Sequence, residues 1–366
     1  MKIGIICFWD RYATPYLSKY ERLLEQQGID YEVIFWNRLP SSSNTTIVQK
    51  DNVVYIDKYC REGLAKSISF IGWRRECIKI LRQKKYDNLI ILSTVPAILL
   101  QDYIIRHYKG RYIFDIRDYT LESNRLFRKM VMKLIENSTL TPISSKGFLR
   151  WLEPSSKIMI NHNITVDSSI MFDAPSFSDG NKVKVSFVGN VRLDTQTKAM
   201  MLSLGKSDVV EQHFYGRILP TCDIEHVTNE NGLTNVVLHG SFDNSEKVAI
   251  YKNTDLINTV YANAVTEDEI PLGDSTPLPN RLYDALVFYR PLVTSKGTYL
   301  AELVDQYRLG VNVNGFDVNV EQEIIDYTRS FDAADFKAGC DELRQLVLAE
   351  EAEFVRVIKE IFTSWK

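Results

Sequence analysis

The sequence predicts an α/β protein with two domains in tandem, each built on a parallel sheet. Three observations lead to this prediction. The chain has 366 residues, too many for one ordinary core. Short runs of aliphatic and β-branched residues alternate with stretches of helical periodicity, which is typical of βαβ units. The polar segment 173–181 separates two such series.

The first series runs through the N-terminal half of the chain. We predict strands at residues 2–9, 31–36, 53–56, 89–92 and 111–115, and helices at 16–27, 64–85, 97–108 and 125–137. Segment 41–46 reads as a polar loop. This part is expected to form an N-terminal, acceptor-binding Rossmann-like domain over residues 1–172.

The second series follows the polar segment. We predict strands at residues 183–188, 209–215, 236–239, 256–260 and 292–294, and helices at 197–204, 245–251, 281–289 and 299–307. These elements are expected to form a donor-binding Rossmann-like domain over residues 182–345. A long helical stretch, 336–362, ends the chain. We expect its last part, residues 346–366, to pack back on the first domain.

The composition favours a reducing, cytoplasmic setting. The five cysteines are scattered and form no CxxC or Cys/His cluster, which argues against a disulfide framework or structural zinc. The longest apolar stretch, 89–100, is broken by polar residues and a proline, and is too short to span a bilayer. No His, Cys, Asp or Glu set has metal-ligand spacing, so no metal site and no cofactor are predicted.

Charge is distributed unevenly along the chain. Residues 1–170 carry 26 Lys and Arg against 17 Asp and Glu, whereas the remainder carries 18 against 30. The basic half could face an anionic membrane, a phosphorylated acceptor or nucleic acid. Helix 64–85 places Trp73 beside Arg74 and Arg75, which suits a membrane interface. It also suits an ordinary helix packed on a sheet. Nucleic acid is disfavoured, because no aromatic-stacking motif accompanies the charge.

The run 277–293 carries the strongest local signal. Prolines flank Leu278, and Asn280 is predicted to cap a helix that starts at Arg281. An apolar stripe faces the core, while Asn280 and Asp284 lie one turn apart beside the helix N-terminus. Free N–H groups at such an end suit a phosphate, and a carboxylate one turn along can accept hydrogen bonds from sugar hydroxyls. The run therefore indicates a nucleotide-sugar site.

A second candidate segment opens the C-terminal domain. Its first strand ends at Gly189, where backbone can approach a ligand closely. Arg192 and Lys198 follow, six residues apart across a strand-to-helix loop, so both could reach one diphosphate. The alternative is a pair of solvated surface cations. Likewise, Asp284 could be a solvated acid near Arg281.

These segments together resemble the donor domain of the retaining family-four glycosyltransferases, which have the GT-B fold. The resemblance rests on Phe187-Val188-Gly189 with Arg192 and Lys198, on segments 235–240 and 255–261, and on 278–293 with Ser295 and 300–303. In the first half, Phe114-Asp115-Ile116-Arg117-Asp118 resembles a strand end of the acceptor domain in bacterial cell-surface polysaccharide enzymes. Segments 141–144 and 160–163 resemble those before the domain crossover.

The resemblance implies two Rossmann-like domains facing across a cleft, and it implies roles for single residues. Arg192 and Lys198 would hold the donor pyrophosphate, Asp284 would bind the ribose hydroxyls, and Asn280 would lie near the phosphate or donor sugar. We assign catalytic roles to Arg192, Lys198 and Asp118, and donor-binding roles to Gly189, Asn190, Arg217, Asn280, Arg281 and Asp284. Asp118 could be an acceptor base, or it could join Asp115 in a structural pair with Arg117.

The chain also departs from the family pattern. Thr276 stands where a first glutamate is usual, and Asp284 replaces the second. The acids Glu267, Glu269 and Asp274 are close in sequence but out of register.

We therefore predict a glycosyltransferase of the hexosyltransferase type. It would move a sugar from a nucleotide diphosphate-sugar to a glycan or lipid-linked oligosaccharide, with retention of configuration, in capsule or exopolysaccharide synthesis. Its place would be the cytoplasm, at the inner face of the membrane. Two alternatives stay open: a catalytically silent GT-B subunit that supports a partner transferase, and a nucleotide-sugar 2-epimerase.

Overall fold

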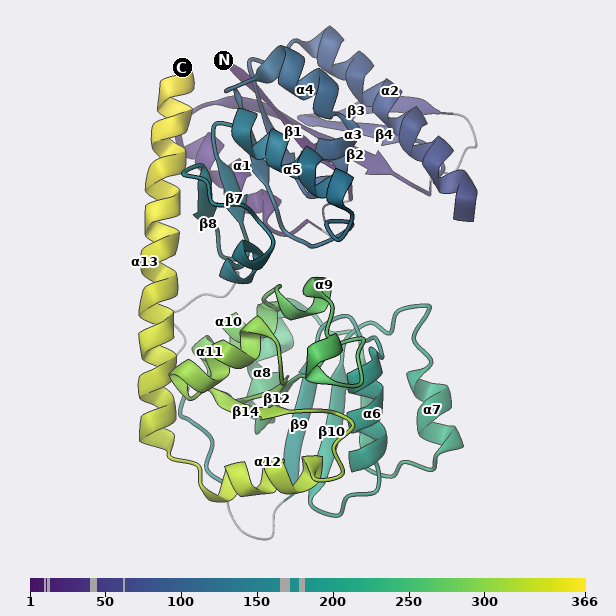
Figure 1. The fold of residues 1–366 in the computed structure, drawn as a ribbon, viewed down its shortest axis with the longest axis vertical. Coiled ribbons are helices and arrows are strands. Elements are labelled where there is room, and N and C mark those ends of the chain that lie inside the picture. Colours follow the sequence, from purple (N-terminus) through teal and green to yellow (C-terminus); the bar gives the residue numbers. More distant parts are fainter. Residues whose placement is uncertain (10, 12–13, 40–44, 62, 165–171, 178–181) are drawn as a thin grey trace. The chain divides into compact units, whose positions relative to one another are not determined.

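The computed structural model describes the chain except residues 10, 12–13, 40–44, 62, 165–171 and 178–181 (Figure 1). It divides into two compact units. Unit 1 comprises Met1–His162 and Ala349–Lys366, and unit 2 comprises Asn163–Leu348. We describe each unit by itself.

Unit 1 contains a six-stranded sheet in the order β3-β4-β2-β1-β5-β6. Its strands are β1 (Lys2–Cys7), β2 (Asp30–Asn37), β3 (Thr46–Lys50), β4 (Val53–Asp57), β5 (Asn88–Leu92) and β6 (Tyr112–Asp115). All neighbours pair in parallel except β3, an edge strand that is antiparallel to β4. A separate parallel pair joins β7 (Thr141–Ile143) to β8 (Ile158–Ile160).

Helices cover both faces of the unit 1 sheet. One face packs against α2 (Lys66–Lys84), α3 (Thr94–Leu99), α4 (Gln101–Tyr108) and α5 (Arg125–Asn137). The other face packs against α1 (Leu17–Gln26) and the end of α13 (Ala333–Trp365), which buries Phe354, Ile358 and Phe362 there. Two short 3-10 helices, η1 (Gly63–Ala65) and η2 (Lys146–Arg150), lie before α2 and after β7.

Unit 2 contains a second six-stranded sheet, which is parallel throughout, in the order β11-β10-β9-β12-β13-β14. Its strands are β9 (Val183–Val188), β10 (Val210–Tyr215), β11 (Val236–Gly240), β12 (Leu256–Thr259), β13 (Leu292–Ser295) and β14 (Gly310–Val313). The prediction of an α/β fold with two Rossmann-like sheets is confirmed.

The unit 2 sheet is also covered on both faces. On one face lie α6 (Thr195–Leu204), α7 (Ile224–Glu230) and α12 (Val320–Arg329). On the other lie α8 (Lys247–Lys252), α10 (Asn280–Phe288), α11 (Tyr299–Tyr307) and the first part of α13. The remaining helical pieces are η3 (Asn244–Glu246), η4 (Glu267–Glu269) and α9 (Leu272–Ser275).

Several local predictions were wrong or incomplete. The helix expected at 97–108 is two helices, because α3 already starts at Thr94 and the chain breaks at Leu100. Pro96 lies in the first turn of α3, where a missing N–H costs nothing. Strands β3 and β14 and helices α7 and α12 were not predicted. Most of the expected loop 41–46 lies outside the described residues, and its end begins β3.

The proposed membrane-facing tryptophan is also wrong. Trp73 is fully buried and stacks on Trp36, with ring centroids 6.0 Å apart. Helix α2 therefore turns its tryptophan into the core, and its exposed apolar residues are Ile68 and Ile71 instead.

Candidate functional site

Glycines end three neighbouring strands at the carboxyl edge of the unit 2 sheet: Gly189 after β9, Gly216 after β10 and Gly240 at the end of β11. Gly216 follows β10 with a φ of 138°, and a Cβ there would lie 1.6 Å from the carbonyl oxygen of Gly189. Gly189 follows β9 with a φ of 142°, but no other atom lies within 4 Å of its would-be Cβ. The two loops thus touch backbone to backbone, and the space beside Gly189 is open. Ligands bind at this edge in open parallel sheets.

Arg281 reaches this edge from the first turn of α10. Its guanidinium carbon lies 3.9 Å from the centroid of the Phe187 ring, near the end of β9. Its Nη1 is buried, and none of the described residues accepts a hydrogen bond from it. Buried charges are normally paired, so this arrangement is costly for unit 2 alone. A negatively charged ligand would offset that cost.

The electrostatics of Arg281 point the same way. Burial lowers the pKa of Arg281 to about 10; the neighbouring charge of Arg192 lowers it too, while Tyr251, Tyr261 and Asp284 oppose the change. Arg192 is close enough to repel it. The structure therefore brings two of the predicted cations together, and an anion between them would relieve the repulsion.

The two predicted catalytic cations lie at the surface, and each pairs with an acid. The Nε of Arg192 pairs with an Asp194 oxygen at 2.8 Å, and its side chain is 57% exposed. The Nζ of Lys198, on α6, lies 3.3 Å from an Asp223 oxygen and its side chain is 42% exposed. The Lys198–Asp223 pair is exposed on both sides and therefore weak, so a phosphate could displace Asp223, whereas the Asp194 side chain is only 14% exposed.

The start of α10 differs from the prediction. The helix begins at Asn280 itself, and the preceding Pro279 occupies the cap position without a side-chain hydrogen bond. Asn280 is therefore not the N-cap. Its Oδ1 accepts a hydrogen bond of 2.7 Å from Nδ2 of Asn163, the first residue of unit 2. Proline has no side-chain acceptor, so Pro279 leaves the first N–H groups of α10 without a side-chain cap.

Asp284 is buried and has partners within unit 2. It is 3% exposed, and both oxygens lie 3.1 Å from Nζ of Lys247 on α8. The hydroxyl of Tyr251 also donates to Oδ2 at 2.7 Å. The alternative of a solvated acid is therefore wrong. Lys247 is itself largely covered, so this is a pair that ties α8 to α10.

The remaining predicted donor-site residues are distributed around the same edge. Asn190 and Arg217 are exposed in the loops after β9 and β10. Thr276 is fully buried, and its hydroxyl donates to the Leu272 carbonyl. The nearest described acid before it, Asp274, accepts hydrogen bonds from the backbone and side chain of Asn263.

The predicted acceptor-side residues lie in unit 1, after β6. Asp115 is fully buried, and Arg117 pairs with it at 2.6 Å, while Tyr20 and Asn161 donate to its Oδ2. Burial opposes the charge of Arg117, yet Asp115 holds its pKa above the ordinary value. Asp115 thus has a structural role. Asp118 is exposed as a residue, but desolvation of its carboxyl and the charge of Asp115 raise its pKa while Arg117 opposes the change, so it is coupled electrostatically to this network.

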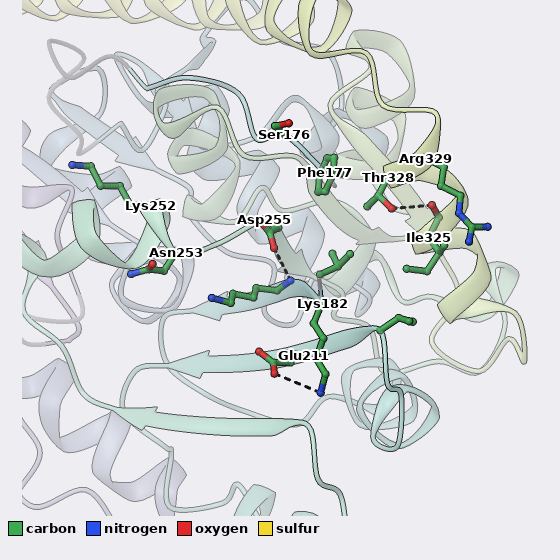
Figure 2. A pocket seen from close by; sticks show the side chains of 13 residues that line it. Ser176, Phe177, Lys182, Glu211, Lys252, Asn253, Asp255, Ile325, Thr328 and Arg329 are labelled. Carbon is green, nitrogen blue, oxygen red and sulfur yellow. Dashed lines mark hydrogen bonds and ion pairs between the residues drawn. The ribbon is translucent and has the colours of Figure 1, made fainter. Parts of the chain in front are cut away.

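A cavity of about 970 Å³ lies at the opposite, amino edge of the unit 2 sheet (Figure 2). Its walls carry Lys182, which faces Glu211 at 3.7 Å, and Asp255, which accepts from the Lys184 N–H at 2.8 Å. None of the predicted site residues lines it. Among the described residues, no group of three or more His, Cys, Asp or Glu could hold a metal ion.

The sequence analysis missed three side chains at the donor edge. Phe187 supports Arg281, while Lys247 and Tyr251 hold Asp284. Phe187 belongs to the motif Phe187-Val188-Gly189 on which the resemblance rests, but the sequence analysis assigns it no role of its own. Lys247 lies 37 residues before Asp284, and neither periodicity nor spacing connects two helices at that separation. The hydroxyl of Tyr251 was a possible signal, because a buried tyrosine usually finds a hydrogen-bond partner.

No protein-family model matches the sequence, and no curated protein matches it. Solved structures do. The sucrose-phosphate synthase of Thermosynechococcus elongatus aligns with a TM-score of 0.72 at 12% identity, over 100% of both chains. The lipopolysaccharide outer core galactosyltransferase WaaB aligns with a TM-score of 0.67 at 13% identity, over 98% of this chain and 100% of that one. The chain has the GT-B fold.

A third GT-B structure is known with ligands bound. Anabaena HepE, in complex with UDP and glucose, aligns with a TM-score of 0.56 at 14% identity, over 98% of this chain and 100% of that one. At such identities the likeness concerns the fold. In addition, no helix among the described residues is long and apolar enough to cross a bilayer.

Proposed function

We propose that this chain is a glycosyltransferase that uses a nucleotide diphosphate-sugar as donor and retains the configuration of the transferred sugar. The observation that carries the proposal is the pair Arg281 and Arg192 at the carboxyl edge of the unit 2 sheet. One guanidinium is stacked and partly desolvated, with an unpaired Nη1, and the other repels it. A diphosphate is the ligand whose charge and size best satisfy both.

The chemistry follows from that placement. When a sugar leaves a diphosphate, negative charge builds up on the phosphate oxygens. Arg192, Arg281 and Lys198 would stabilise this charge, and the N-terminus of α10 would add its free N–H groups. The open space beside Gly189 would admit the phosphates close to the backbone. In a retaining reaction of this kind the leaving phosphate can take the acceptor proton.

The nucleotide of the donor is proposed to be UDP, since the HepE structure contains UDP and a trehalose-6-phosphate structure from E. coli contains UDP-2-fluoro glucose. Asp284 would recognise the ribose through the acceptor capacity that Lys247 and Tyr251 leave on its two oxygens, since a carboxylate offers about four lone pairs. Titration with UDP and with 2′-deoxy-UDP checks this role. Wild type should prefer UDP, and Asp284→Asn should reduce that preference; an equal preference in both proteins would remove Asp284 from the ribose site.

The acceptor is proposed to be a glycan or lipid-linked oligosaccharide of cell-surface polysaccharide synthesis, with Asp118 near its reacting hydroxyl. Attachment to an anionic membrane is supported by α2, where Ile68, Ile71 and Arg75 lie on one exposed stripe. Sedimentation with phosphatidylglycerol vesicles tests the attachment. Ile68→Ser/Ile71→Ser should reduce the bound fraction severalfold, and a bound fraction equal to wild type would refute this surface.

Turnover of variants tests the transferase assignment. Arg192→Ala and Lys198→Ala should each lower turnover of a nucleotide sugar by about a hundredfold or more, because charge stabilisation in the transition state is lost. Their unfolding midpoints should stay close to wild type, since both side chains are exposed. Normal turnover in both variants would overturn the site.

The silent-subunit alternative has specific support. Thr276 has no carboxylate, and its buried hydroxyl already donates a hydrogen bond. The carboxylate of Asp284 already has two partners, so neither position offers a free carboxylate. A silent subunit would bind a partner without turning over any nucleotide sugar. Sugar interconversion without an acceptor would instead indicate the epimerase.

A further inference from the structure

Trp9 has an unusual position for so large an apolar side chain. It follows β1 at the carboxyl edge of the unit 1 sheet and is 44% exposed. The other four tryptophans are less accessible: Trp36, Trp73 and Trp151 are buried, and Trp365 is half-buried. An exposed indole at this edge of a parallel sheet lies where ligands of such sheets bind.

The ring is held from one side. The guanidinium carbon of Arg38 lies 3.6 Å from the Trp9 centroid, and Phe8 packs against Trp9 edge to face at 6.1 Å. Arg38 is fixed in turn, because Nη2 donates to the Phe8 carbonyl at 3.2 Å and the cation also lies over the Phe8 and Trp36 rings. Arg38 covers one face of the ring while Trp9 is 44% exposed, so we infer that the other face is the accessible one.

We propose that the open face of Trp9 is a stacking platform for a pyranose ring of the acceptor. The C–H groups on one side of a pyranose are slightly positive, and the face of an indole is negative, so the two attract. The platform is already ordered by Arg38 and Phe8, so binding loses little side-chain entropy. The proposal extends the transferase function proposed above. It rests on that function only for identifying the bound sugar as part of the acceptor.

The position of the platform says which part of the acceptor it binds. Strand β5 lies between β1 and β6, so the ends of β1 and β6 are two strand spacings apart, about 10 Å. Asp118 follows β6 and is an exposed residue. Trp9 therefore binds a sugar away from Asp118, and the acceptor is an oligosaccharide rather than a single sugar.

Fluorescence quenching tests the platform directly. In a Trp365→Phe background, Trp9 is the only exposed indole among the described residues, so acrylamide quenching reports on it. The probes are methyl β-glucopyranoside, methyl β-galactopyranoside and methyl α-mannopyranoside, with sorbitol at equal concentration as the control for viscosity. At least one glycoside should lower the quenching constant about twofold, since stacking covers the open face. No protection by any of the three overturns the proposal.

A second measurement uses matched variants. Saturation-transfer NMR of the same glycosides should show contacts to their ring protons that disappear in Trp9→Ala and persist in Trp9→Phe. The control is Phe316→Ala, which removes a ring 43% exposed in unit 2 and should change nothing. Contacts that survive in Trp9→Ala overturn the platform, as does protection by phosphatidylglycerol vesicles without protection by glycosides.

The outcome also separates the platform from the transferase function. UDP is titrated into the same Trp365→Phe protein. Protection of Trp9 by glycosides without UDP binding would leave the platform standing and remove the proposed function. UDP binding without glycoside protection would leave the proposed function standing and remove the platform.

Discussion

Arg281 carries its charge into a place where none of the described side chains accepts a hydrogen bond from Nη1. Natural proteins rarely leave a buried cation unpaired, because desolvation costs several kcal/mol. The stacking on Phe187 recovers part of that cost, and Arg192 adds to it. The simplest physical explanation for the unpaired charge of Arg281 is that this side chain serves to bind a charged ligand and not to stabilise the fold.

Arg281→Met removes the charge and keeps the apolar stem over Phe187. We expect UDP affinity to fall about tenfold to hundredfold, the value of a charge-assisted hydrogen bond. The unfolding midpoint should not decrease, because an unpaired buried charge is lost. Calorimetric titration and thermal unfolding measure both quantities. Arg329→Met, at a side chain 68% exposed, is the matched control. Unchanged UDP affinity in Arg281→Met would contradict the account.

Removal of the charge of Asp284 should destabilise the protein, whereas removal of the charge of Arg281 should not. Asp284→Asn leaves the ammonium of Lys247, which is only 19% exposed, without its acid. We expect a loss of about 3 kcal/mol, or a drop of about 6–12 °C in the midpoint of unit 2. The double variant Asp284→Asn/Lys247→Met should recover part of this loss. A single variant as stable as wild type would show that the pair does not hold α8 to α10.

At the scale of elements, α13 is one helix with two hydrophobic stretches. Phe336, Cys340 and Leu343 are buried in unit 2, and Phe354, Ile358 and Phe362 are buried in unit 1. Where the helix enters unit 1, Glu350 accepts a hydrogen bond of 2.7 Å from His162 and pairs with Lys146, while Glu351 pairs with Lys19 at 2.7 Å. These hydrogen bonds and ion pairs hold α13 beside His162, the residue at which the chain first leaves unit 1.

The pH dependence of unit 1 tests this attachment. Burial opposes ionisation of Glu350, but His162 and Lys146 hold its pKa below the ordinary carboxyl value. A depressed folded-state pKa stabilises the fold above the unfolded pKa, and this contribution disappears as pH falls through the folded value. Glu350→Gln should therefore lower the midpoint of unit 1 at pH 7 and differ little from wild type near pH 3.

The exposed acid Glu342 of the same helix is the control for that comparison. Glu342→Gln should have the midpoint of wild type at both pH values. A deficit of Glu350→Gln that is equally large at low pH would mean that packing, rather than the charge of Glu350, holds the helix.

The elements also show how far sequence alone reaches. Buried parallel strands such as β9 read directly as short β-branched runs. The predicted range 183–188 is that of β9, and the other predicted strands differ from the structure by one or two residues at their ends. Strand β14 and helix α12 were missed because their signals are short or polar. The N-cap prediction failed because the helix starts one residue earlier, with Pro279 at the cap position. Contacts between helices, such as Lys247 with Asp284, depend on tertiary packing that periodicity does not encode.

At the scale of the whole molecule, the chain combines a GT-B fold with an altered acidic pair. Thr276 and Asp284 offer no free carboxylate, whereas three cations remain: Arg192 in the loop after β9, Lys198 on α6 and Arg281 in the first turn of α10. The fold alone does not establish a reaction, since folds host many functions. The central claim is therefore a claim about the cations: that they hold the diphosphate of a nucleotide sugar and promote its departure.

Phosphorus NMR of nucleotide sugars incubated with the full chain tests this claim most directly. The panel contains UDP-glucose, UDP-galactose, UDP-N-acetylglucosamine and GDP-mannose, without an acceptor, and the Arg192→Ala/Lys198→Ala protein is the control. The account predicts that at least one diphosphate ester is slowly converted to free nucleoside diphosphate by wild type and not by the control. Spectra that stay unchanged for all four, with no line broadening, would contradict it.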